Sequence, residues 1–564
     1  MFALSRATAA HTVPFLLAVA LAAVPLRAAP ADPADPAAPV TATVTMHSPD
    51  AIEISYHLPP ACKALAFIND GFAAQAAVHL RSDWTPVDDC TQVDFQSVRP
   101  ARAACTTLRL RVPATTRAQD TRVYGKVEPW AQPVGGGLYA HTAAYAVQGC
   151  GKVDWRFEAP GGTVMVDGSV APDAVVRPAA AVRSDGLAAV LLAQPYQAGA
   201  APFHGDERIA PATRTMLAAT LDEALGALRA LLPGARLAPA YVLALPDPAP
   251  GLRGDVANGT VLRLHVPVQE PADLRERARE LLAHETAHLA QPPRWPAPQG
   301  EDAGAVREGG AEFLRLAIAL HLGWNTPAQV RDTLEAAVNG CAAAAGARPW
   351  RAIEGRGKDE LARRCGLALH ALALARPAHA TALQRLQALY GGAAPNDFGA
   401  IAQALECGGD STCTPRLQAA LGGSAPLRRV LDDEARRPES LIAGAPAWGP
   451  ALTETMALQH LELLVRADCH GRAGIYPDRA APRIGPGLRC GVLREGMVPE
   501  TAEGLPLFAD GAAIAASQAA CRTRGATVLG LRGGGSVTVR CGKEAGGALR
   551  VFGVDEGRML EMMR

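Results

Sequence analysis

Residues 274–289 of this chain read LRERARELLAHETAHL. Their apolar residues recur three and four positions apart, which predicts an amphipathic helix with Asp273 as a possible N-cap. His284 and His288 are four residues apart, so both imidazoles project from one side of such a helix and can reach one metal ion. Glu285, between them, can take a proton from a water on that ion. The pattern predicts a zinc site, and a zinc ion needs a third protein ligand.

Glu308 is the candidate for this third ligand. Apolar residues that begin at Leu314 predict a second helix, with Glu308 in its first turn or just before it. Residues 291–300 are proline-rich and loop-like, so the chain can fold back and bring the Glu308 carboxylate to the two imidazoles. Glu312, one turn beyond Glu308, is placed to accept a hydrogen bond from a ligating imidazole. A surface glutamate is the alternative interpretation of Glu312.

The His-Glu-x-x-His pattern is rare by chance. A chain of 564 residues with 14 histidines should contain it only about 0.02 times. The alternative is a helix whose two histidines face solvent or are satisfied in the core. The downstream carboxylates favour the zinc interpretation.

These residues resemble a known family. His284-Glu285-x-x-His288, followed downstream by the pair Glu308-Gly309, is similar to the gluzincin zinc metallopeptidases, and specifically to their alanyl and glycyl aminopeptidase branch. The resemblance is specific over residues 280–320 and weaker elsewhere. It implies a multidomain α+β fold in which an N-terminal β domain precedes a mainly helical α/β catalytic domain. It also implies peptide-bond hydrolysis with Glu285 as the general base.

The chain departs from the family pattern at the position of the catalytic tyrosine. The alanyl branch has a Tyr-x-x-Gly motif whose tyrosine stabilises the oxyanion, and the best local match here is RRCG at residues 363–366. Arg363 therefore stands in place of the tyrosine. A guanidinium can still stabilise negative charge, or the exchange can mean an impaired enzyme. Tyr390 is a possible substitute, although a tyrosine that ends an amphipathic helix is more often a packing residue.

A second departure concerns the substrate's amino group. The branch uses a Gly-x-Met-Glu-Asn segment whose Glu binds a free amino terminus, and the corresponding residues 254–259 read GDVANG. They contain no Glu, so specificity for an amino terminus is not supported. Asp255 could serve instead, although a turn aspartate is the simpler interpretation.

The N-terminus has the layout of a Sec-type signal peptide. Arg6 precedes the apolar residues 13–26, and small residues follow up to Ala31. The apolar stretch is shorter than the roughly 20 residues that span a bilayer. We therefore expect a secreted or periplasmic protein without stable membrane insertion after signal cleavage.

The hydrophobic periodicity changes along the chain, and these changes suggest its domain boundaries. A length of 564 residues corresponds to about two to four domains. Alternating residues at 40–47, 107–112 and 162–166 predict antiparallel strands, whereas helical spacing with strands at 240–245 and 260–266 follows later. The predicted parts are a signal peptide (1–31), a linker (32–39), a β-sandwich-like domain (40–183), a gluzincin-like metallopeptidase domain (184–465), and a small C-terminal α/β domain (466–564) with a helix at 512–522 and a β-hairpin at 526–541.

Twelve cysteines fit an exported protein. They fall into three groups, before residue 151, between 341 and 413, and after 468, which predicts disulfides within each group. Sequential pairing, such as Cys341 with Cys365, is one of the possible connectivities. No two cysteines have the spacing of a zinc ribbon, so a cysteine-bound metal is not expected.

Composition and net charge exclude some classes of function. Apolar residues make up 49% and charged residues 20%, as in ordinary globular proteins. The 55 Lys and Arg balance the 55 Asp and Glu. The chain therefore lacks the net positive charge that would attract nucleic acid. We expect a zinc metallopeptidase with a peptide or protein substrate and Zn²⁺ as its cofactor. The alternative is a zinc-binding but catalytically weak or inactive relative that acts as a periplasmic binding or scaffold protein. The sequence leaves the oligomeric state open.

Overall fold

The structure is a computed structural model that describes most of the chain after residue 38. The predicted signal peptide, residues 1–31, and the linker up to residue 38 lie outside the described residues. Within the described part, no helix is both long enough and apolar enough to cross a membrane. The described residues are 39–68, 81–115, 119–121, 125–127, 131–142, 145–166, 169–176, 187–195, 203–235, 237, 241–247, 251–257, 261–291, 302–354, 359–391, 398–408, 410, 413–470, 474–478, 481–485, 489–547 and 551–564.

The N-terminal region is built from β-sheets, as predicted. β1 (Val40–Ser48) buries alternate residues, which explains the period of two in its sequence. It pairs antiparallel with β2 (Ala51–His57) and parallel with β13 (Val153–Glu158). The region is antiparallel as expected except where β1 meets β13. A parallel pair needs a long crossover connection and not a hairpin, and the chain between β1 and β13 is long enough to provide one.

Two of these sheets share one core. Val44 and Phe157 from the six-stranded sheet meet Val164 and Leu191 from the five-stranded sheet in the same buried cluster. This arrangement is that of a sandwich. The five-stranded sheet includes β17 (Ala188–Leu192), so it continues past the boundary that we proposed at residue 183.

The sheets of this region have the strand orders β16-β13-β1-β2-β7-β4, β10-β11-β17-β14-β15, β12-β3-β6-β5 and β8-β9. Their other strands are β3 (Leu65–Phe67), β4 (Thr85–Pro86), β5 (Thr91–Val93), β6 (Ser97–Pro100), β7 (Thr107–Pro113), β8 (Gln119–Thr121), β9 (Gly125–Val127), β10 (Ala131–Val134), β11 (Gly137–His141), β12 (Val147–Gln148), β14 (Thr163–Val166), β15 (Ser169–Ala171) and β16 (Asp173–Val176).

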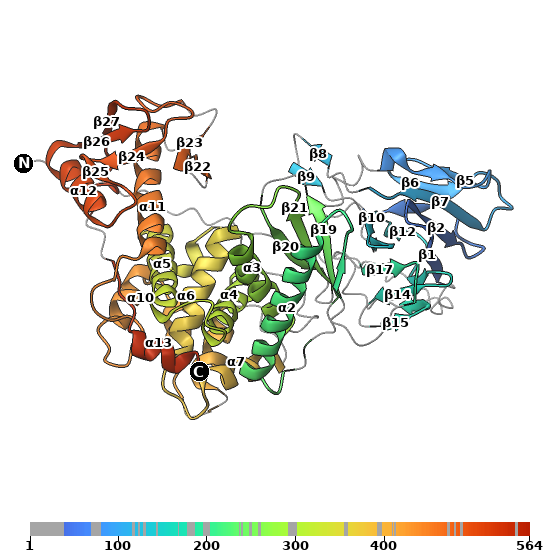
Figure 1. Ribbon diagram of the computed structural model, residues 1–564, viewed down its shortest axis with the longest axis horizontal. Helices are drawn as coiled ribbons and strands as arrows, with labels where there is room; N and C mark the ends of the chain where they lie inside the picture. Colours follow the sequence, from blue (N-terminus) through green and yellow to red (C-terminus); the bar gives the residue numbers. More distant parts are fainter. Residues whose placement is uncertain are drawn as a thin grey trace, which may run out of the picture. The chain divides into compact units, whose positions relative to one another are not determined.

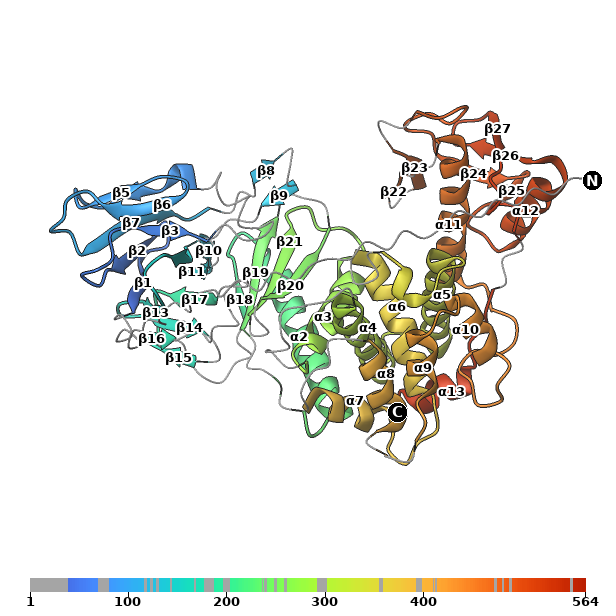
Figure 2. The same ribbon diagram turned by 180° about the vertical axis from the view of Figure 1, so that it is seen from behind.

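The central region combines a small sheet with helices. The strands predicted at 240–245 and 260–266 are β19 (Tyr241–Asp247) and β21 (Val261–Pro267), which pair in parallel. β20 (Arg253–Ala257) forms one edge of this sheet, and β18 (Phe203–Gly205) forms the other. The helix predicted at 274–289 is α3 (Leu274–His288), and it lies against β20 (Figure 1). The same neighbourhood is seen from behind in Figure 2.

The second predicted helix starts earlier than expected. α4 (Ala303–His321) already includes Ala305 and Val306, which are buried, so Glu308 lies in its second turn. The apolar signal that we used begins only at Leu314, which is why the first turns were missed. The other helices of the region are α2 (Pro211–Leu231), α5 (Pro327–Ala345), α6 (Asp359–Leu374), α7 (Ala382–Gly391), α8 (Phe398–Cys407), α9 (Arg416–Gly422), α10 (Leu427–Glu434) and α11 (Pro450–Asp468).

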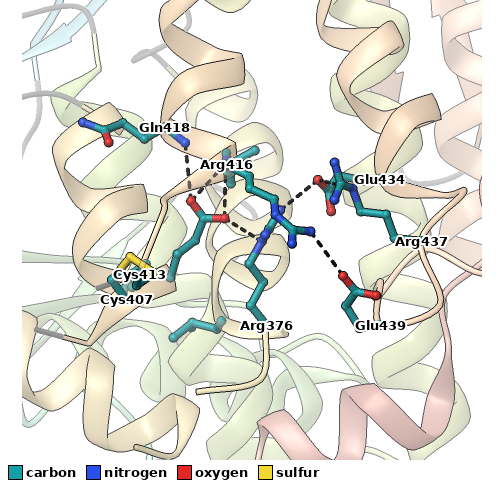
Figure 3. A network of polar contacts seen from close by, with 12 residues as sticks. Arg376, Cys407, Cys413, Arg416, Gln418, Glu434, Arg437 and Glu439 are labelled. Carbon is teal, nitrogen blue, oxygen red and sulfur yellow. Dashed lines mark hydrogen bonds and ion pairs between the residues drawn. A yellow bond between two sulfur atoms is a disulfide. The ribbon is translucent and has the colours of Figure 1, made fainter. Parts of the chain in front are cut away.

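A buried ionic network holds the later helices together (Figure 3). Glu406, in the last turn of α8 next to the disulfide-bonded Cys407, accepts the backbone N–H of Leu417 at the start of α9. Arg376 lies 2.5 Å from Glu406 and 2.9 Å from Glu434 of α10. Glu406 is 3% exposed. A carboxylate buried to this degree needs both a cation, here Arg376, and hydrogen-bond donors, here the backbone of α9. The network therefore ties α8, α9 and α10 to the end of α6.

The C-terminal region contains the predicted helix and hairpin, as α12 (Ala512–Arg524), β26 (Ala526–Leu531) and β27 (Ser536–Arg540). Beyond them the chain returns to the central helices. Phe552, and Met559 and Met562 of α13 (Glu556–Met562), pack in the same core as α4 to α6, and Asn339 of α5 bonds both backbone groups of Phe552. The remaining strands are β22 (Ile475–Asp478), β23 (Ala481–Ile484), β24 (Pro499–Ala502) and β25 (Leu505–Pro506).

The twelve cysteines form six disulfides, each within one of the three predicted groups. The pairing Cys341–Cys365, suggested from the sequence, is present and joins α5 to α6. Pairing is not sequential in the first group, where Cys62–Cys150 encloses Cys90–Cys105.

Candidate metal centre

Helix α3 presents its two histidines to one point. His284 and His288 are both buried, and their Nε2 atoms lie 3.1 Å apart. The four-residue spacing on the helix accounts for this proximity, because it places both side chains on one face.

Glu308 of α4 completes the cluster. Its Oε2 lies 3.3 Å from His284 Nε2, and its Oε1 lies 3.8 Å from His288 Nε2. Ligands about 2.0–2.1 Å from a tetrahedral zinc ion lie roughly 3.3 Å from one another. The three ligand atoms all fall within 4.8 Å of one another, so their spacing suits one zinc ion. The structure thus brings together the three residues that the sequence singled out.

Gln291 sets the proton position on His288. The Gln291 side-chain N–H donates to the Arg307 carbonyl at 2.7 Å, which leaves its Oε1 to face His288 Nδ1 at 2.8 Å. An amide oxygen only accepts, so His288 Nδ1 must carry the proton. The Nε2 of neutral His288 then has a free lone pair directed at the cluster.

Glu312 does the same for His284. Its Oε1 lies 3.0 Å from His284 Nδ1, and its Oε2 accepts from Arg315 Nε at 2.6 Å. Burial raises the pKa of Glu312, but the Arg315 charge and the contact with His284 outweigh it and lower the pKa. A carboxylate at this distance favours the proton of a neutral His284 on Nδ1, which leaves Nε2 as the nitrogen that can bind a metal ion. Glu312 therefore lies where we expected a group that orients a ligating imidazole.

The donor set calls for a cation. Two imidazole Nε2 atoms and a carboxylate converge, and if both imidazoles were neutral, their lone pairs would face an anion with no cation between them. Burial lowers the pKa of His284, but Glu308 and Glu312 outweigh it and raise that pKa. Burial, and then the charge of His284, lower the pKa of His288. A single positive charge is thus favoured in the metal-free cluster, and a divalent ion fits the same position and donors.

Glu285 lies beside this cluster at the wall of a cavity of about 1050 Å³. Its side chain is 4% exposed. Gly254 of β20 lines the same cavity, and a Cβ at this position would lie 3.3 Å from Glu285 Cγ. The absence of a side chain at 254 therefore gives Glu285 its room. The Asp255 side chain lies outside the described part of the structure.

Arg363 also lines this cavity. It lies in the first turns of α6, is about half exposed, and places its Nε 3.5 Å from Glu308 Oε2. Burial raises the pKa of Glu308, but His284, His288 and Arg363 outweigh it and lower that pKa. Tyr390, the other candidate for the missing tyrosine, is buried with its hydroxyl over Gly310, and burial raises its pKa. Of these two candidates, Arg363 is among the described residues that line the cavity, and Tyr390 is not.

Sequence reasoning missed two residues that orient the imidazoles. Gln291 follows His288 by three residues, a spacing at which side chains meet on a helical turn, and this signal could have been used. Arg315 has the same spacing from Glu312. Gly254 was considered only for the Glu that is absent from its segment, and its role beside Glu285 had no signal in the sequence.

Comparison with known proteins gives structural neighbours only. No protein-family profile matches this chain, and no curated protein matches it. The chain is similar to the aminopeptidase N family protein from Idiomarina loihiensis, with 11% identity and a TM-score of 0.46, over 93% of this chain and 99% of that one. It is also similar to the M1 zinc metallopeptidase from Deinococcus radiodurans, with 17% identity and a TM-score of 0.33, over 68% and 93% of the two chains.

A third similar structure is leukotriene A4 hydrolase from Saccharomyces cerevisiae, with 10% identity and a TM-score of 0.38, over 76% of this chain and 71% of that one. The structural neighbours thus include the aminopeptidases and zinc metallopeptidases that residues 280–320 resemble.

Proposed function

We propose that this chain is an exported zinc-dependent metallopeptidase that hydrolyses peptide bonds. The observation that carries the proposal is the convergence of three ligand atoms, from His284, His288 and Glu308, beside a large cavity. These residues would hold the ion, with one coordination position left for water or substrate. The six disulfides support export, because such bonds persist outside the cytosol.

The bound ion would polarise the scissile carbonyl and lower the pKa of its water toward about 7. Glu285 takes the proton of the attacking water on its carboxylate and then gives it to the leaving amine. Its buried position next to Gly254 keeps the carboxylate close to the metal ligands and away from bulk solvent. Glu312 and Gln291 hold the imidazoles in the ligating tautomer throughout.

Arg363 is the candidate for stabilising the negative charge on the substrate oxygen. It lines the cavity beside Glu308, and its guanidinium is always charged. A fixed positive charge at this wall can do what the hydroxyl does in the alanyl branch, although with a different geometry. The absence of a Glu in residues 254–259 means that the proposal does not require a substrate with a free amino terminus.

Replacing Glu285 by Gln tests the mechanism. We expect Glu285→Gln to lose hydrolysis of a peptide library and to keep its zinc, because glutamine retains the shape but not the proton acceptor. Glu280→Gln is a matched control, since Glu280 lies five residues earlier on α3 and lines the same cavity. Wild-type turnover in Glu285→Gln with zinc bound would refute the general-base role.

The second candidate function is a zinc-binding protein with little or no catalysis, acting as a periplasmic binding or scaffold protein. The arginine at 363 favours it, because the family pattern has a tyrosine there. A digest of a peptide library with and without chelator separates the two functions. Chelation that changes stability while no peptide is cleaved at any zinc level would favour the scaffold function.

A further inference from the structure

The position of Arg363 is set by helix packing. α4 and α6 cross at Gly309 and Gly366, where a Cβ on Gly366 would lie 2.1 Å from the Ala305 carbonyl oxygen. Glu308 precedes the first of these glycines, and Arg363 lies one turn before the second. The crossing therefore brings the guanidinium to Glu308. The neighbouring disulfide Cys341–Cys365 fixes this part of α6 to α5.

Five described arginines line the cavity, and Arg363 forms a different ion pair from the other four. Each of those four pairs with a carboxylate that is not a candidate metal ligand. The pairs are Arg253 with Asp247, Arg277 with Asp273, Arg315 with Glu312 and Arg364 with Glu360. The ion pair of Arg363 is with Glu308.

The contact involves the very oxygen that faces the histidines. Glu308 Oε2 lies 3.5 Å from Arg363 Nε and 3.3 Å from His284 Nε2. An ion held by His284 and Glu308 would thus share this oxygen with the guanidinium. Two positive charges that close to each other repel, and the pair is exposed enough for water to weaken that repulsion without removing it.

We propose that Arg363 is a built-in counter-cation of Glu308 that competes with the metal ion and weakens zinc binding. This inference rests on the proposed function and deepens it by naming what regulates the loading of the site. Without metal, the guanidinium neutralises the Glu308 carboxylate. When the ion takes that carboxylate, the guanidinium loses its partner and becomes available to an anionic substrate oxygen. The same side chain therefore lowers zinc affinity and supports catalysis.

Zinc dissociation constants of the full-length chain test this inference. The protein is stripped with a chelator and titrated with zinc alone in competition with a chromophoric chelator. We expect Arg363→Gln to bind zinc about tenfold or more tightly than the wild type, and Arg363→Lys to remain close to it, because lysine keeps the charge. The difference should shrink at high salt. Arg364→Gln is the matched control, since Arg364 lines the same cavity from the same helix but pairs with Glu360.

Equal zinc affinity in the wild type and Arg363→Gln would overturn the inference and leave the proposed peptidase untouched. An equal gain in zinc affinity in Arg364→Gln would also overturn it. The effect would then come from the total positive charge around the cavity and not from the ion pair with Glu308. If neither the wild type nor Arg363→Gln binds zinc, the proposed function fails, and the inference fails with it.

Discussion

Gly366 of α6 rests directly on Gly309 of α4, since a Cβ built on Gly309 would lie 2.3 Å from the Gly366 Cα. Glycine at both positions allows two backbones to approach more closely than side chains permit. Gly309 is one residue from Glu308, and Gly366 is three residues from Arg363. The geometry of the candidate site thus depends on two residues without side chains.

Gly366→Ala is therefore expected to separate α4 from α6. The added methyl group meets the backbone of Ala305 and Gly309 rather than a flexible side chain, so we expect a destabilisation of about 1–3 kcal/mol. Urea denaturation measures it. Gly226→Ala in α2 is the control, because a Cβ there meets nothing within 4 Å and alanine should stabilise the helix by about 0.5–1 kcal/mol. Equal effects of the two substitutions would contradict this account of the crossing.

Gly254→Val should impair catalysis more than zinc binding. Its side chain would press on Glu285 Cγ, Leu281 and the Arg263 carbonyl, all near 3.2–3.3 Å from a Cβ at this position. Because the zinc ligands lie on α3 and α4, we expect zinc content near that of the wild type and kcat reduced by about tenfold or more. Gly254→Ala should have an intermediate effect. An unchanged kcat in Gly254→Val would show that catalysis does not depend on the space that Gly254 leaves for Glu285.

Gln291→Leu should weaken metal binding. The substitution removes the oxygen that accepts the Nδ1 proton of His288 at 2.8 Å, so the imidazole is no longer held in the ligating tautomer. Loss of such a partner typically costs about 10–100-fold in metal affinity. Competition with a zinc chelator measures the dissociation constant. A dissociation constant equal to that of the wild type would mean that α3 alone orients His288.

His460 makes stability depend on pH. Its Nε2 lies 2.7 Å from Ser517 Oγ, which donates in turn to Thr527, so the imidazole acts as a neutral donor between α11 and α12. Burial lowers the pKa of His460 to about 4, whereas an unfolded histidine has a pKa of about 6.5. The unfolded chain therefore binds a proton that the folded chain does not. Stability is full above about pH 6.5 and falls as the pH drops toward 4, by about 2 kcal/mol at pH 5.

Urea denaturation of His460→Gln at pH 7.5 and pH 5 tests this dependence. Glutamine can still donate to Ser517 but does not titrate. We expect the variant to be less stable than the wild type at pH 7.5 and to lose less stability on acidification. Parallel pH profiles would assign the acid sensitivity to other groups, such as the buried His370, whose pKa burial also lowers to about 4.

Much of the local structure could be predicted because its signals are short in range. The alternation in β1 and the helical spacing in α3 each reflect one face turned to a core, and both elements are present near the predicted residues. The start of α4 was not predicted because its first turns contain few large apolar residues, although Ala305 and Val306 are buried there. The groups of cysteines could be predicted from their positions, but the enclosure of Cys90–Cys105 by Cys62–Cys150 could not.

The sequence by itself determined the residue types of the candidate site, because the spacing of His284 and His288 on a helix requires no knowledge of the rest of the chain. Only the tertiary structure decided which groups surround them. Arg363 reaches Glu308, and Phe552 returns to α5, through contacts between segments distant along the chain. Such contacts depend on how whole helices cross, and no local pattern of residues encodes that.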